Sequence, residues 1–235
     1  MNKAHNAPYS ASFSADMKIF ELIDKEPSTL SIFSRLNITL PFGDMSIDEM
    51  CKRDGYSTDL FLTLCSMHAD INFRPRPEHL TTDMLPEVVG YLRASHHYYA
   101  TQMLPHALRH LEDILNHAND LSRSVLRRFY DDYVHYIVDH FHEEEEHIFA
   151  IIDRATDRLA ADFSIIDAPH TDIDDRTNDI ASLIIKSLPE SAPTALRCAM
   201  LKDIYALRDD LRRHSNIETH LLKPLVDKYI NERRG

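Results

Sequence analysis

Two histidine–glutamate pairs are the residues of this chain whose types and spacing best suit metal binding. They are His140 with Glu144 and His214 with Glu218. In each pair the glutamate follows the histidine by four residues, so on a helix both side chains project from the same face. Imidazole nitrogen and carboxylate oxygen are common ligands of first-row transition metals. Each pair is therefore predicted to supply two ligands to a metal centre.

Two further histidines, His97 and His170, lie on intervening segments that are predicted to be helical. With the two pairs they make a set of four imidazoles and two carboxylates. This set is too large for one closed tetrahedral zinc site, and it suits two metal ions bridged by the carboxylates, with positions left for a small ligand. Burying two glutamates without a cation would be costly. Iron or manganese fits these nitrogen and oxygen ligands best.

Neighbouring histidines leave alternatives open. His147 follows His140 by seven residues, on nearly the same helical stripe, and is the rival ligand of that segment. The choice between His96 and His97 is open from the residues alone. A larger group is interpreted as exposed surface histidines: His96, His135, His142 and His220.

Four long stretches with apolar residues at helical spacing must position these side chains. They run from about Leu85 to Ala118, Leu121 to Thr156, Ala168 to Leu188, and Thr194 to Glu232. The short connections between them predict an up-down-up-down four-helix bundle. Pro105 lies inside the first stretch and predicts a kink or a local opening of that helix.

The segment before the bundle is predicted to form a small helical domain. In chain order, the expected features are helices over Met17–Asp24 and Ser28–Leu36, a capping box of Ser46 and Glu49 that opens a third helix, Gly55 at its end, and Ser57 or Thr58 at the start of a fourth. The stretch Asn72–Glu78 holds two prolines and no apolar period, which places a domain boundary there. The predicted domains are residues 1–78 and 79–235.

Composition narrows the classes of function. The 235 residues carry a formal net charge of −12, which argues against a nucleic-acid or anionic-membrane surface. No window approaches the roughly 18 apolar residues of a membrane span. Three widely spaced cysteines without a C-x-x-C motif, Cys51, Cys65 and Cys198, favour a reducing compartment, so a cytoplasmic protein is expected.

One alternative function is DNA binding by the small helical domain that precedes the bundle. The stretch Ser46–Met67 has the length of a helix-turn-helix. However, residues 1–71 contain six Lys and Arg against ten Asp and Glu, whereas a DNA-binding domain normally has an excess of Lys and Arg. Nucleic-acid binding is therefore not expected.

The metal-binding residues also resemble those of a known family. His97 with Pro105 eight residues downstream, the two His-x-x-x-Glu pairs and the lone His170 are similar to the hemerythrin-like HHE cation-binding domain, and most similar to the repair of iron centres (RIC) family. The resemblance covers about Leu85–Tyr229. It implies a hemerythrin-like bundle and six metal ligands: His97, His140, Glu144, His170, His214 and Glu218. It also implies two non-haem iron ions with oxo and carboxylate bridges, although manganese and zinc accept the same ligands.

The front segment resembles the small helical domain that precedes the bundle in that family, with one departure. Where the family carries adjacent cysteines, this chain reads Leu40-Pro41-Phe42-Gly43. Thiol chemistry is therefore not expected from this position.

The resemblance implies a role in the nitrosative and oxidative stress response, with iron donation for the repair of iron–sulfur clusters as the family's form. The implied partners are O₂ or nitric oxide and iron–sulfur proteins. Two alternatives remain: a sensor or carrier of O₂ or nitric oxide, and a di-iron enzyme that reduces nitric oxide or peroxide. Tyrosines near the site could serve such an enzyme, or they are core residues with satisfied hydroxyls: Tyr98, Tyr99, Tyr130, Tyr133 and Tyr136.

Overall fold

The structure is a computed structural model that describes residues 9–153, apart from 11 and 40, and residues 171–234. These residues form helices and no strand, which confirms the predicted all-α fold. The chain divides into two compact units. The first unit comprises the residues up to Ala94 together with those from Arg213 onward, and the second comprises Ser95–Arg212.

The four predicted long helices are present in the described residues, and three of them are interrupted. The predicted end of the second helix at Thr156 and the predicted start of the third at Ala168 lie outside those residues. In chain order the elements are α5 (Leu85–Tyr98), the π-helical turn η5 (Tyr99–Met103), α6 (Leu104–Leu115), α7 (Asp120–Glu144), the π-helical turn η6 (Glu145–Phe149), α8 (Ala150–Asp153), α9 (Thr171–Ser187), α10 (Thr194–Ile217), the π-helical turn η8 (Glu218–Leu222) and α11 (Lys223–Arg234). Of the helices in the described residues, none is long and apolar enough to cross a membrane.

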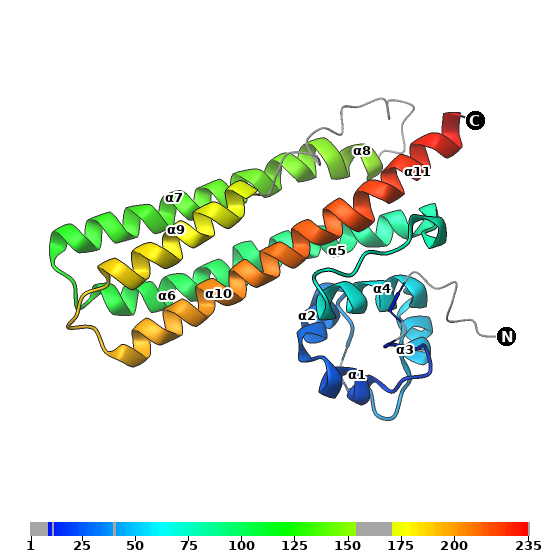
Figure 1. The fold of residues 1–235 in the computed structure, drawn as a ribbon, viewed down its shortest axis with the longest axis horizontal. Helices are drawn as coiled ribbons and strands as arrows, with labels where there is room; N and C mark the ends of the chain where they lie inside the picture. Colours follow the sequence, from blue (N-terminus) through cyan, green and yellow to red (C-terminus); the bar gives the residue numbers. More distant parts are fainter. Residues whose placement is uncertain (1–8, 11, 40, 154–170, 235) are drawn as a thin grey trace. The chain divides into compact units, whose positions relative to one another are not determined.

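The second unit is a bundle in which α6, α7, α9 and α10 run side by side (Figure 1). Each helix turns an apolar stripe inward, so that residues such as Leu111, Ile137, Ile180 and Ile204 meet in one core. Burial of these side chains provides the main driving force for the packing. The predicted helical bundle is thereby confirmed.

Two of the three π-helical turns in the described residues are followed directly by a helix that has proline as its second residue. Pro105 is the second residue of α6, directly after η5, and Pro224 is the second residue of α11, directly after η8. A proline has no N–H to donate to the preceding turn, and its ring clashes with the carbonyl four residues before it. A widened turn before the proline avoids that clash. The local opening predicted at Pro105 is confirmed.

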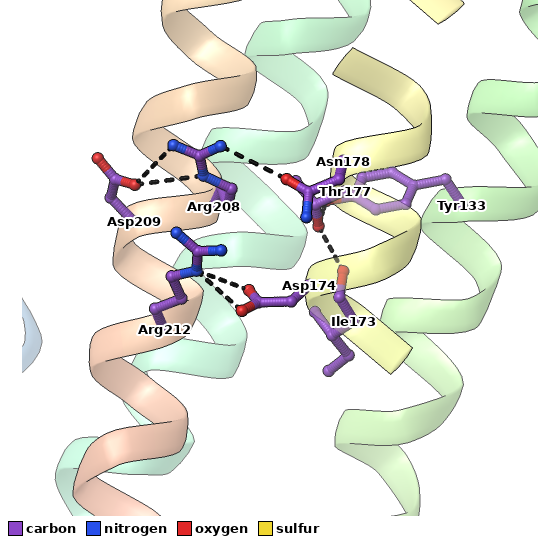
Figure 2. Close-up of polar contacts among 8 residues, drawn as sticks. All are labelled: Tyr133, Ile173, Asp174, Thr177, Asn178, Arg208, Asp209 and Arg212. Atoms are coloured by element: carbon purple, nitrogen blue, oxygen red, sulfur yellow. Dashed lines mark hydrogen bonds and ion pairs between the residues drawn. The ribbon is translucent and has the colours of Figure 1, made fainter. Parts of the chain in front are cut away.

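Polar contacts tie α9 to both of its neighbours (Figure 2). Nε of Arg212 on α10 donates to both carboxylate oxygens of Asp174, at 3.0 and 2.8 Å. On the other side of α9, Oγ1 of Thr177 lies 2.9 Å from the hydroxyl of Tyr133 on α7. Thr177 already donates its own proton to the carbonyl of Ile173, so Tyr133 is the donor of this bond.

The first unit begins with short helices, and caps were predicted for two of them, α3 (Ile47–Asp54) and α4 (Thr58–Ala69). The elements of this part are α1 (Ile19–Lys25), the 3₁₀ turn η2 (Pro27–Thr29), α2 (Leu30–Arg35), α3, α4, and the 3₁₀ turns η3 (Pro77–His79) and η4 (Thr82–Met84). Ser46 and Glu49 form the capping box of α3, and Ser57 caps α4. Gly55 ends α3 with a φ of 80°, which glycine adopts without strain.

Tyr91 connects these front helices to α5 within the first unit. Its hydroxyl accepts a hydrogen bond from Arg35 on α2 at 3.0 Å and lies 2.7 Å from Nε2 of His68 on α4. All three side chains are buried. The predicted boundary after Glu78 stays a prediction.

Candidate metal centre

Four buried side chains form a group with the composition of a metal site: His96, Glu144, His214 and Glu218. Each offers one nitrogen or oxygen atom, and these four atoms all lie within 4.8 Å of one another. The residues come from α5, α7, α10 and the first position of η8. Each is 3% exposed or less.

The helical spacing of the two predicted pairs brings their side chains together. Nε2 of His140 lies 3.1 Å from Oε1 of Glu144, and Nε2 of His214 lies 3.0 Å from Oε1 of Glu218. Glu144 is the last residue of α7, and Glu218 is the first residue after α10. Each glutamate therefore lies where a regular helix passes into a π-helical turn, a feature that is frequent at functional sites.

His96 is held in one orientation from several sides. Its Nδ1 lies 2.9 Å from Oε1 of Glu145, and its Nε2 lies 3.3 Å from Oε2 of Glu144. The rings of Phe141 and Phe149 stack against the imidazole, with centroid distances of 4.1 and 5.5 Å. With the proton on Nδ1 donated to Glu145, the lone pair of Nε2 faces Glu144. This arrangement, a carboxylate that orients a histidine, is typical of metal ligands.

The placement of His96 corrects an expectation from the sequence. His96 was expected to be exposed, but it is 3% exposed, whereas His97 lies on the surface. Adjacent residues of a helix point about 100° apart, so only one of the two can face the interior. The structure therefore places His96 in the buried group and His97 on the surface, and the choice of metal ligand on this segment stays a prediction.

A signal for His96 was present in the sequence. Val88, Leu92, His96 and Tyr99 follow one another at intervals of four, four and three residues, and all four are buried. His96 continues the apolar stripe of α5, while His97 lies beside it. The stripe predicts the buried histidine more directly than the distance to Pro105.

The other predicted residues are placed as follows. His140 lies beside Glu144, with 21% of its side chain exposed, and is not part of the group of four. The rival ligand His147 is exposed, as are His135 and His142, whereas His220 is half-buried. His170 lies outside the described residues, which resume at Thr171.

Three of the five tyrosines considered for catalysis are core residues. Tyr99 donates to the backbone carbonyl of Asp210, Tyr130 donates to that of Leu104, and Tyr133 donates to Thr177. Burial raises the pKa of Tyr130 and Tyr133 above the ordinary value of a phenol. All three hydroxyls satisfy polar groups inside the bundle, and those of Tyr130 and Tyr133 are weaker acids than an ordinary phenol.

The donor set fits a metal cation. Glu144 and Glu218 place two carboxylates in the interior, and a buried carboxylate is costly unless a positive charge or a metal compensates it. His96 and His214 add two imidazoles, and no cysteine belongs to the group. Imidazole with carboxylate suits iron, zinc and manganese rather than a soft, sulfur-seeking ion.

Comparison with known proteins agrees with this geometry. None of the curated proteins matches the chain significantly, and no solved structure does. The family model described as "Hemerythrin HHE cation binding domain" matches residues 88–226. The matched span reaches from α5 into α11 and includes all four residues of the buried group. It also covers more than half of the chain, so the chain belongs to the hemerythrin HHE cation-binding domain family.

Proposed function

We propose that this chain holds a non-haem di-iron centre and acts in the response to nitrosative and oxidative stress. The buried group of two histidines and two glutamates is the observation that carries the proposal. The family to which the chain belongs supports an iron centre as well, because hemerythrin domains bind metal cations, typically iron.

The ligands in this proposal are the described residues His96, His140, Glu144, His214 and Glu218. His170, predicted from the sequence, would be the sixth ligand, and His96 takes the place first given to His97. Bound iron would supply reversible binding of a diatomic ligand and a change of oxidation state. Since hemerythrin domains commonly bind O₂, O₂ is the first ligand to test and nitric oxide the second.

The protein's own contribution is to hold these ligands ready and keep water away. Phe141 and Phe149 cover the imidazole of His96 and fix its plane. Glu145 holds the proton of that ring on Nδ1. A preorganised set of ligands loses little entropy when a metal binds, and the apolar cover limits access of solvent to the centre.

The thiols of the front helices do not carry the proposed activity. Cys51 and Cys65 are buried, and burial raises the pKa of Cys51 to about 12 and that of Cys65 above its usual value. A thiol that stays protonated is a poor nucleophile and a poor metal ligand. Iron donation to damaged iron–sulfur clusters would therefore use the iron centre without help from Cys51 or Cys65. The free cysteines fit a reducing compartment such as the cytoplasm.

The test is to purify the full chain without oxygen and measure its metal content and visible spectrum before and after O₂ or nitric oxide. We expect two iron ions per chain and spectral changes with at least one of the two gases. Glu218→Gln should lose the iron, while the exposed control His135→Ala should keep it. A wild-type protein that takes up no iron would refute the proposal.

Donation is tested separately, by incubating the iron-loaded protein with an apo iron–sulfur enzyme. Reactivation faster than with the same amount of free ferrous iron supports repair. Equal reactivation rates would exclude a role in cluster repair and leave the binding of O₂ or nitric oxide as the proposed function.

A further inference from the structure

A second cluster of metal-binding side chains lies on α6 and α10. It consists of His106, His110 and Asp203, with one nitrogen or oxygen atom of each residue within 4.8 Å of the others. The two histidines are four residues apart on α6, so their rings project from one face, with centroids 4.8 Å apart. Asp203 reaches both rings from α10.

A single oxygen of Asp203 is shared by the two imidazoles. Its Oδ2 lies 2.5 Å from Nδ1 of His110 and 3.8 Å from Nε2 of His106. Zinc binds nitrogen and carboxylate oxygen at about 2.0–2.2 Å, so a cation would fit between these atoms after movements of about 1 Å. It would take the place of the proton between Nδ1 of His110 and Oδ2 of Asp203, and the ring of His110 would then carry its proton on Nε2. Two histidines of one helical turn with an acidic residue from another helix supply three protein ligands, which is the number in an open zinc site.

The cluster is accessible and has room for further ligands. The side chain of His106 is 50% exposed, that of His110 26% and that of Asp203 21%. His106 and Asp203 line a cavity of about 280 Å³, which Arg109 also lines. Water or an anion can therefore complete the coordination of a cation held by the three residues.

Arg109 fits this arrangement. In the structure its Nη2 donates to Nδ1 of His106 at 2.9 Å, which puts the proton of that ring on Nε2. When a cation takes Nε2, the ring binds its proton at Nδ1 instead, and the exposed guanidinium is released toward the cavity. There its charge can pair with an anion bound to the cation.

We propose that His106, His110 and Asp203 form a surface site for one first-row divalent cation of the zinc type. This site does not depend on the buried group, because it uses none of its residues. Imidazole and carboxylate ligands with open positions suit zinc, and also iron, cobalt or nickel, whereas calcium and magnesium prefer oxygen ligands alone.

The experiment uses the full chain with both Glu144→Gln and Glu218→Gln, treated with a chelator, so that neither carboxylate of the buried group is present in any sample. Titration with zinc chloride should show one site per chain. Adding His106→Ala or Asp203→Asn should weaken this site by about 100-fold, because loss of an outer partner alone already costs 10- to 100-fold. His135→Ala, also an exposed helical histidine, should leave the affinity unchanged.

Anomalous diffraction at the zinc edge from crystals of the wild-type protein gives a second readout. A peak between His106, His110 and Asp203 supports the site. Equal zinc affinity with and without His106→Ala, or the absence of a peak at this position, would overturn it. Either result is distinct from failure of the buried centre, which is judged by iron content in a chain with His106, His110 and Asp203 intact.

Discussion

His96 is contacted by two consecutive glutamates, Glu144 at Nε2 and Glu145 at Nδ1, at 3.3 and 2.9 Å. Glu144 ends α7 and Glu145 begins the π-helical turn η6. One carboxylate belongs to the buried group and the other orients the ring from its far side. The junction between α-helix and π-turn thus presents a candidate ligand and its orienting partner in adjacent positions.

The orienting role of Glu145 leads to the first prediction. Glu145→Ala should weaken binding of ferrous iron by about 10- to 100-fold, because the ring of His96 loses the acceptor that fixes its proton. Anaerobic titration with ferrous iron measures the change. Glu146→Ala is the matched control, since Glu146 is exposed and pairs with His142. Equal affinities for the two variants would contradict the role of Glu145.

The second prediction separates His96 from His97. His96→Ala should reduce the iron content per chain, since it removes a residue of the buried group. His97→Ala should retain both the iron content and the spectrum, because its side chain is exposed. Metal analysis of the two variants, purified side by side, decides between them. The reverse result would restore the original assignment of His97.

The third prediction concerns stability. A metal that binds only the folded state stabilises it by RT ln(1 + [L]/Kd), which is about 2.7 kcal/mol when the free metal concentration is 100 times Kd. Urea unfolding of the wild-type protein should show this increase on addition of ferrous iron without oxygen. Glu218→Gln should show little of it. If iron stabilises both proteins equally, its binding site does not include Glu218.

The fourth prediction tests the contact between α7 and α9. Thr177→Val removes the acceptor of the Tyr133 hydroxyl while keeping the shape of the side chain. Both residues are buried, so the free energy of unfolding should fall by about 1–3 kcal/mol, the cost of an unsatisfied buried polar group. The neighbouring exposed Asn178→Ala should change it by no more than about 0.5 kcal/mol. A Thr177→Val protein as stable as the wild type would show that Tyr133 finds another partner.

The helices of this protein could be predicted because their signals are local. The capping box of Ser46 and Glu49 and the left-handed Gly55 mark the ends of α3 through bonds within a few residues. The pairing of His140 with Glu144, and of His214 with Glu218, follows from the four-residue turn in the same way. Such features require no knowledge of what packs against the helix.

The parts that could not be predicted depend on helix rotation and on contacts between helices. A π-helical turn adds one residue to a turn and so shifts every later side chain around the helix axis. The turn η6 contains no proline that would have predicted it from the sequence. The contact of Glu145 with His96 joins residues 49 positions apart. The pair of His110 and Asp203 joins α6 to α10 across 93 positions. Neither contact leaves a periodic trace in the sequence.

The last prediction concerns the cysteines and pH. Alkylation requires the thiolate, and burial raises the pKa of Cys51 from 9.0 to about 12 and that of Cys65 well above 9.0. At pH 8 only the exposed Cys198 should react quickly with a thiol reagent in the native protein, so Cys198→Ser should abolish the fast phase. In denaturant all three should react. The thiol of Cys51 loses its proton near pH 9 in the unfolded chain, whereas the folded chain keeps that proton until about pH 12. The contribution of this buried thiol to the free energy of unfolding is therefore complete below pH 9 and is lost as pH rises toward about 12. Fast labelling of Cys51 at pH 8, located by peptide mass mapping, would contradict this prediction. It would show that α3 opens and that the Cys51 thiol is available for reaction.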